Sequence, residues 1–142
     1  YGHWYPHGRS DEAFVAALLN QIEGTARAMA AIREVVPGAR LVQTEDLGKS
    51  HGTVPLRHQT RFENERRWLT VDLLSGRVTP QHELWTYLVG EGGADPARLL
   101  ALADAVREAG RYGLYDLDRL ERMILRRVTR EYFLLEGESD DD

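Results

Sequence analysis

Apolar residues recur at intervals of three and four near the start of the chain. The series consists of Phe14, Val15, Leu18, Leu19, Ile22, Ala26, Met29, Ile32 and Val36. Such spacing places one apolar stripe along a helix. Ser10 precedes the stripe as a candidate N-cap, and Pro37-Gly38 follows it as a stop signal. The pattern therefore predicts a long amphipathic helix between these two signals.

The segment that follows, residues 39–44, is short and partly β-branched, and it is the one convincing strand candidate in the sequence. A lone strand leaves its backbone donors and acceptors unsatisfied if it is buried. A helix followed by a strand normally belongs to a larger parallel sheet or barrel. We therefore expect a mostly helical α/β fragment with one strand and about five helices.

The remaining helices are predicted from their start signals. Thr60 and Glu63 form a capping-box pattern, and Thr79-Pro80 and Asp95-Pro96 each join an N-cap residue to a proline at the first helical position. Glycines end these three helices, at Gly76, Gly92-Gly93 and Gly110. A fifth helix is predicted over residues 116–132, with its arginines mostly outside.

Composition narrows the class of protein. The chain has 142 residues, 42% of them hydrophobic and 29% charged, which is ordinary for a globular domain with a core. The net charge is −5, and the acidic end, residues 136–142, carries much of it, so a nucleic-acid partner is not expected. The chain has no cysteine, and neither a membrane span nor a signal peptide is visible. These features predict a cytoplasmic protein without a membrane partner.

Two groups of residues could contact a substrate. Glu45 and Asp46 directly follow the predicted strand, where carboxylates could bind sugar hydroxyls or take part in acid/base chemistry. The alternative is that Asp46 caps a turn and Glu45 is solvated. The first loop could stack on a sugar and hydrogen-bond to it, or its aromatics could simply anchor the loop. Its candidate residues are His3, Trp4, Tyr5 and His7.

No metal or other cofactor is predicted. The histidines at positions 3, 7, 51 and 58 are predicted to lie in loops and lack an acidic partner at a fixed spacing. Asn64-Glu65 is similar to a catalytic Asn-Glu pair, but it lies in the first turns of a predicted helix. Glu63, Glu65, Arg66 and Arg67 are therefore interpreted as a solvated helix surface.

Three segments resemble the middle of proteins similar to family 1 glycoside hydrolases, which are β-glucosidase-like (β/α)8 barrels. These segments are Tyr1-Gly2-His3-Trp4-Tyr5-Pro6-His7-Gly8-Arg9, Ala39-Arg40-Leu41-Val42-Gln43-Thr44-Glu45-Asp46-Leu47-Gly48-Lys49 and Phe62-Glu63-Asn64-Glu65-Arg66-Arg67-Trp68-Leu69-Thr70. The resemblance covers residues 1–104 and implies a barrel piece running from just after strand four through strand five.

The same resemblance implies that this chain holds no catalytic residue. The family uses two glutamates, one in an Asn-Glu-Pro motif that would fall before Tyr1 and one in a Thr-Glu-Asn-Gly motif beyond the matched part. We therefore expect a glycosidase fragment that is inactive alone, with carbohydrate as its partner. Glu45, Asp46 and the His3–His7 loop remain as substrate-side candidates, and whether the chain is an enzyme is left open.

The end of the chain is predicted to have a different origin. Residues 105–135 form a helical tail that resembles insertion-sequence transposition proteins, and residues 136–142 form an acidic, disordered end. The alternative function is therefore a small helical interaction protein or a transposition-associated DNA-binding protein. A barrel piece without its neighbours would also expose apolar faces, so we expect self-association.

Overall fold

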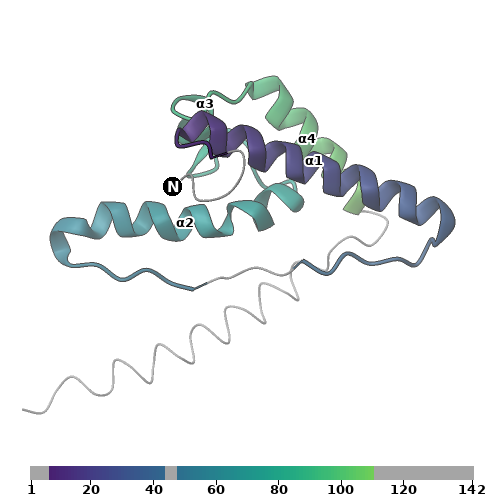
Figure 1. Cartoon of the computed structure of the whole chain (residues 1–142), viewed down its shortest axis with the longest axis horizontal. Coiled ribbons are helices and arrows are strands. Elements are labelled where there is room, and N and C mark those ends of the chain that lie inside the picture. The colour runs from purple at the N-terminus through teal and green to yellow at the C-terminus, as the bar shows by residue number, and fades with distance from the viewer. Residues whose placement is uncertain (1–6, 44–47, 111–142) are drawn as a thin grey trace, which may run out of the picture.

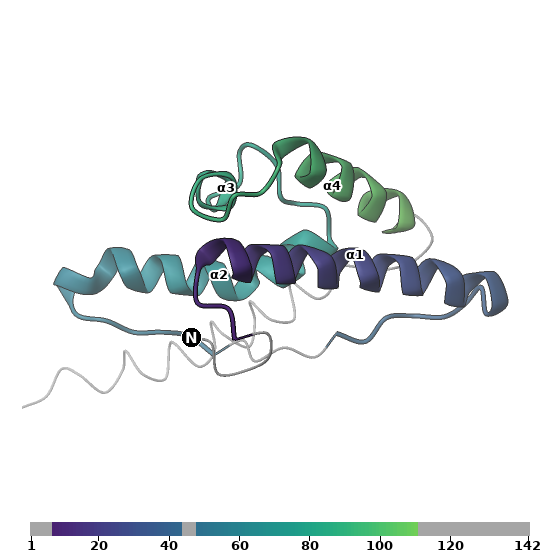
Figure 2. The ribbon, with the colours of Figure 1, turned by 45° about the horizontal axis from the view of Figure 1, so that its top comes forward.

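The computed structural model describes residues 7–43 and 48–110. Their elements, in chain order, are α1 (Asp11–Val35), the 3-10 turn η1 (Val54–Leu56), α2 (Arg57–Leu74), α3 (Trp85–Val89) and α4 (Pro96–Gly110). Helices α1 and α2 run in the same direction, and the segment that joins them returns along the pair (Figure 1). Helices α3 and α4 lie together on one side of that pair (Figure 2).

Helix α1 confirms the first prediction. Its N-cap is Ser10, whose side-chain oxygen accepts a hydrogen bond from the backbone N–H of Ala13 at 3.2 Å. Asp11 and Glu12 in the first turn suit the positive end of the helix dipole. The helix ends at Val35, just before Pro37. The buried residues all come from the predicted stripe: Val15, Leu18, Leu19, Ile22 and Met29.

The predicted strand is wrong, and with it the α/β class and the barrel piece. Residues 39–43 contain no strand, nor does any other part of the described chain, and Thr44 lies outside it. The carbonyl of Ala39 accepts a hydrogen bond from Nε of Arg33 at 3.1 Å instead of joining a sheet ladder. Val42 is 83% exposed. Strand propensity alone does not make a strand when no second strand pairs with the segment.

The predicted start of α2 is also wrong. Val54–Leu56 form a 3-10 turn with a proline at its start, and this turn continues directly into α2 at Arg57. Thr60 therefore lies inside the helix, where its hydroxyl donates to the carbonyl of Leu56 at 2.9 Å. Its side chain bonds back to the preceding turn rather than capping a new one. The end of α2 is as predicted, because Gly76 has a φ of 66°.

The helix predicted from Thr79-Pro80 begins later than expected. Residues 79–84 form successive turns, and α3 starts at Trp85. The backbone N–H of Leu84 donates to Nδ1 of His82 at 3.1 Å, a local bond that competes with helix formation. The start of α4 at Pro96 is confirmed, because Oδ1 of Asp95 accepts from the backbone N–H of Ala97 at 3.0 Å.

A leucine-rich core holds the helices together. Its members with the least exposure are Val15 and Leu19 on α1, Leu69 on α2, Val78 in the turns, Leu88 on α3 and Leu99 on α4. At the edge of this core, Arg98 of α4 reaches α1, where its Nε lies 2.7 Å from Oε1 of Glu23. This hydrogen bond lowers the pKa of Glu23. The apolar core and a peripheral ion pair therefore both fix α4 against α1.

The structure does not test two of the sequence predictions. The proposed change of origin at residue 105 falls inside α4 and stays a prediction. The fifth helix and the acidic end, within residues 111–142, lie outside the described residues. Within the described residues, no helix is both long and apolar enough to cross a membrane.

Gly24 in the middle of α1 gives a stability prediction. A Cβ atom at this position would have no atom within 4 Å, and Gly24 has no positive φ. Gly24→Ala is expected to raise the free energy of unfolding by roughly 0.5–1 kcal/mol, because alanine is the better helix former. Urea denaturation followed by circular dichroism measures the change. As a control, Gly76→Ala is expected to destabilise, since its Cβ would lie 2.6 Å from the carbonyl oxygen of Ala103.

Candidate functional site

An open groove of about 810 Å³ lies between α1 and α2. Its lining residues are Phe14, Leu18, Gln21, Ile22, Gly24, Thr25 and Ala28 from α1, Gln43 from the connecting segment, and Arg66, Arg67, Thr70 and Leu74 from α2. The lining combines apolar side chains with amide, hydroxyl and guanidinium groups. Among these described residues two are arginines and none is acidic, so the described part of the lining carries positive charge.

Helical spacing explains the mixed lining on the α1 side. Leu18, Gln21, Ile22 and Thr25 are three or four positions apart and therefore share one side of the helix. Leu18 and Ile22 are also buried in the core, whereas Gln21 is exposed. The groove thus follows the edge of the apolar stripe, with an apolar floor and a polar rim.

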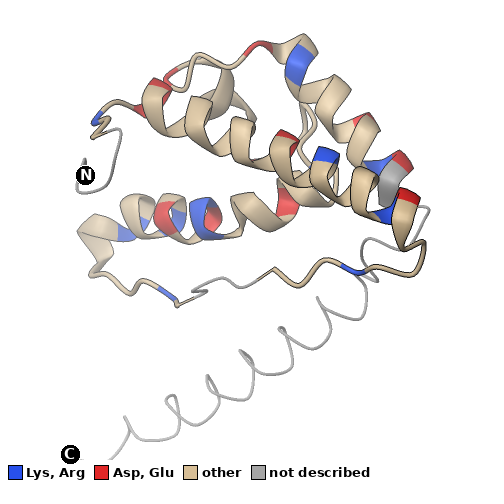
Figure 3. Cartoon of the chain, turned by 45° about the vertical axis from the view of Figure 1, so that its right-hand side comes forward, with Lys and Arg blue, Asp and Glu red and all other residues tan. Residues whose placement is uncertain are grey.

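Arg66 lies at the end of the groove where α1 and α2 carry aromatic residues. Its guanidinium carbon is 5.1 Å from the ring centroid of Phe14 and 5.8 Å from that of Phe62. Nη2 of Arg66 lies 3.2 Å from Oε2 of Glu63, one turn earlier on α2. Acidic and basic residues lie close together along this part of α2 (Figure 3). These contacts hold the Arg66 side chain in a half-buried position beside Phe14.

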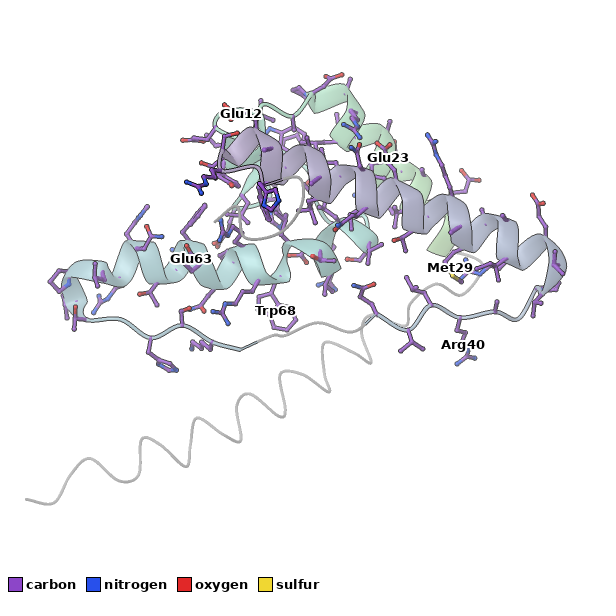
Figure 4. All side chains as sticks on the ribbon, in the orientation of Figure 1. Glu12, Glu23, Met29, Arg40, Glu63 and Trp68 are labelled. Carbon is purple, nitrogen blue, oxygen red and sulfur yellow. The ribbon has the colours of Figure 1, made fainter. Side chains whose placement is uncertain are left out.

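Arg67 and Asn64 attach the connecting segment to α2. Nη1 of Arg67 donates to the carbonyl of Gly48 at 2.6 Å, and Nη2 donates to Oγ of Ser50 at 3.1 Å. The amide of Asn64 forms two bonds with the Ser50 backbone, accepting from N–H at 2.8 Å and donating to C=O at 3.0 Å. In Figure 4, Trp68 projects from α2 on the side away from α1. The segment around Ser50 is therefore fixed on α2 beside the groove.

Tyr87 connects α3 to the first turn of α1. Its hydroxyl donates to Oδ1 of Asp11 at 2.6 Å, and its ring packs edge-on against Phe62 at a centroid distance of 4.9 Å. Two effects raise the pKa of Tyr87 to about 12: first its partial burial, and then the hydrogen bond that its hydroxyl donates to the Asp11 carboxylate. This contact joins the three helices near the Arg66 end of the groove.

The raised pKa of Tyr87 predicts a loss of stability at alkaline pH. The unfolded chain loses this proton near the ordinary pKa of 10.0, whereas the folded chain keeps it up to about 12. The corresponding stability is complete below pH 10.0 and is lost as the pH rises to about 12. We expect Tyr87→Phe to flatten this decline, measured by urea denaturation at several pH values in that window. Parallel curves for the variant and the unchanged chain would contradict the assignment.

A second polar cluster fixes the turns after α2. Nε2 of His82 lies 3.2 Å from Oδ2 of Asp72, and Nδ1 of His82 accepts from the Leu84 N–H. Because Nδ1 accepts, the ring proton is assigned to Nε2, which donates to Asp72. Nearby, partial burial and the carboxylate of Glu83 raise the pKa of Glu65. Both ring nitrogens of His82 are occupied by protein groups, so this cluster has a structural function.

The structure describes just one of the predicted site residues. His7 is exposed and has a φ of 62°, and it is not part of the groove lining. His3, Trp4, Tyr5, Glu45 and Asp46 lie outside the described residues. In the chain from His7 to Gln43 and from Gly48 to Gly110, no group of three potential metal ligands occurs.

The polar residues of the groove are not among the site residues predicted from the sequence. Gln21, Thr25 and Thr70 lie beside the apolar stripes of their helices, and this position can be identified from the sequence. The sequence does not show which edges of the two stripes face each other. Arg66 and Arg67 are interpreted from the sequence as part of a solvated helix surface with paired charges. Arg67 is exposed and Arg66 pairs with Glu63, as that interpretation expects, but Arg66 is half-buried and both arginines also line the groove.

Comparison with known proteins gives no relative. No known protein family matches the chain, and neither a curated protein nor a solved structure does. The glycoside hydrolase resemblance therefore stays a sequence-based prediction, separate from the barrel architecture that the structure contradicts.

Proposed function

We propose that this chain is a helical carbohydrate-binding module that holds a sugar in the groove between α1 and α2 without cleaving it. The observation that carries the proposal is the lining itself. Hydrogen-bonding side chains from both helices and the connecting segment surround an apolar floor in an open space of about 810 Å³. Ligand sites commonly combine apolar surface with a few placed polar groups.

The chemistry of the groove suits a polyhydroxylated ring. Gln21 offers both amide donors and an amide acceptor, and the hydroxyls of Thr25 and Thr70 can donate or accept. Phe14 is 39% exposed and supplies an aromatic surface at the end of the groove. A sugar could therefore exchange its water contacts for hydrogen bonds on the rim while its apolar face meets the floor.

Binding is favoured over hydrolysis. Most glycosidases use two carboxyl groups that flank the scissile bond. The described lining of the groove contains neither Asp nor Glu. Gln43 lines the groove. The candidates Glu45 and Asp46 follow it closely in sequence but lie outside the described residues, so their substrate-side role stays a prediction.

Calorimetric titration of the full chain with a panel of neutral and acidic mono- and disaccharides tests the proposal. We expect saturable binding of at least one sugar, and chromatography of the same mixtures is expected to recover the sugar uncleaved. The absence of binding across the panel would reject the proposal. Turnover of a bound disaccharide would reject its non-catalytic part.

Self-association is a second candidate, supported by exposed apolar side chains. Val35, Val36 and Val42 are 82%, 54% and 83% exposed, and Val54 and Leu56 are 74% and 57% exposed. Burial of such surface between two copies would be favourable. Sedimentation velocity over a range of concentrations is expected to show a growing oligomer fraction. A single monomeric species at every concentration would reject this candidate. The DNA-binding alternative depends on residues 105–142, most of which lie outside the described part.

A further inference from the structure

We infer that the ligand of the α1–α2 groove is an acidic sugar, whose anionic group binds beside Arg67. This inference rests on the proposed function and specifies its ligand class. The groove lining contains Arg66 and Arg67 and, among its described residues, no carboxylate. Glu63 partly offsets the charge of Arg66, whereas the acceptors of Arg67 are uncharged. A neutral sugar would leave the charge of Arg67 without an anionic partner among the described lining residues, and an acidic sugar would supply one.

Arg67 is the better placed of the two arginines. The acceptors that fix it, the Gly48 carbonyl and the Ser50 hydroxyl, are both uncharged, so these contacts orient the guanidinium without neutralising it. A guanidinium has more N–H donors than these bonds use. Ser50 is in turn held by Asn64, so the site of positive charge is built before a ligand arrives.

Arg66 contributes to the positive potential of the groove rather than binding the anionic group directly. Glu63, which is not part of the groove lining, lies 3.2 Å from its Nη2 and offsets part of its charge. The rings of Phe14 and Phe62 further restrict its guanidinium. The anionic group is therefore placed at the Arg67 side, and the sugar ring extends over the apolar floor towards Phe14.

The anion could be a carboxylate or a phosphate, because arginine binds both through charge-assisted hydrogen bonds. Glucuronic acid and glucose 6-phosphate represent these two sources, and glucose is the neutral reference. Titrations use the full chain and three variants. Arg67→Met removes the charge but keeps an aliphatic stem, and Arg67→Lys keeps the charge. Arg61→Met removes one charge from an exposed position on the same helix that does not line the groove.

We expect at least one acidic sugar to bind roughly tenfold more tightly than glucose in the unchanged chain. Arg67→Met is expected to weaken the acidic sugar far more than glucose and so to remove that preference, while Arg67→Lys retains part of it and Arg61→Met retains all of it. Circular dichroism and urea denaturation of each variant establish that it is folded. Whichever acidic sugar binds more tightly than glucose in the unchanged chain identifies the recognised group: glucuronic acid indicates a carboxylate, and glucose 6-phosphate a phosphate.

Three outcomes would overturn the inference. If glucose binds as tightly as both acidic sugars, the ligand class is wrong although the groove still binds sugar. If Arg67→Met stays folded and weakens all sugars equally, or Arg61→Met removes the preference, Arg67 does not recognise charge. If no sugar binds at all, the proposed function fails together with this inference.

Discussion

Replacing Gly24 by tryptophan is expected to abolish sugar binding in the groove while the chain stays folded. Gly24 lines the groove, and a Cβ atom built on it would have no atom within 4 Å. The indole can therefore enter the space that the ligand needs without a clash at its root. Tryptophan also forms helix more readily than glycine, so α1 should not be weakened.

Gly24→Ala is the matched control for this blocking variant. It changes the same backbone position but adds one methyl group, which leaves most of the roughly 810 Å³ open. We expect calorimetry to detect no heat of binding for Gly24→Trp and an affinity within about threefold of the unchanged chain for Gly24→Ala. Unaltered sugar affinity in a folded Gly24→Trp chain would place the binding site elsewhere.

Leu69→Ala is expected to lower the free energy of unfolding by about 2–5 kcal/mol, which is a large fraction of the stability of a small domain. Leu69 is 0% exposed and lies on α2, the helix that packs against both α1 and α4. Truncation removes buried apolar surface and leaves a cavity that the surrounding leucines cannot fully close. Loss of this contact would also loosen the α2 wall of the groove.

Leu100→Ala separates the cavity effect from the change of residue type. Leu100 lies on α4 and is 41% exposed, so the same substitution in a helix removes little buried surface. We expect a change within about 0.5 kcal/mol, measured by urea denaturation alongside Leu69→Ala. Equal losses for the two variants would mean that Leu69 is not at the centre of the core.

Local signals predicted α1 and α4 because their ends are set by neighbouring residues. Ser10 caps α1 and Asp95 caps α4, and both caps form as expected. The predicted cap at Thr60 was wrong, because the helix already starts at a turn that precedes it in sequence. The turn at Val54–Leu56 starts the helix first, so Thr60 becomes an interior residue.

The strand was predicted wrongly because strand formation depends on a partner that is distant in sequence. Residues 39–43 have suitable side chains, but α1 and α2 pack directly against each other with no sheet between them among the described residues. The contrast with α1 is physical. A helix satisfies its own backbone, whereas a strand needs a second one.

The groove could not be predicted because it depends on how two helices pack. Gln21 and Thr25 are ordinary polar residues at the edge of a stripe until α2 brings Arg67 and Thr70 opposite them. Periodicity identifies the stripe but not the neighbour. Glu45 and Asp46 are predicted instead from their position after a strand, and the described chain contains none. The first-loop candidates are predicted from their aromatic and polar side chains, which do not depend on how α1 and α2 pack.

The most direct test of carbohydrate binding between α1 and α2 is a two-dimensional NMR titration of the full chain with the tightest-binding sugar of the panel. The side-chain amide of Gln21 and the backbone amides of Thr25 and Thr70 report on both walls of the groove. We expect these signals to shift together and to saturate at the calorimetric affinity, while Ala101 on the exposed side of α4 stays unchanged. Saturable shifts confined to residues outside the groove, or no shifts at all, would contradict the account.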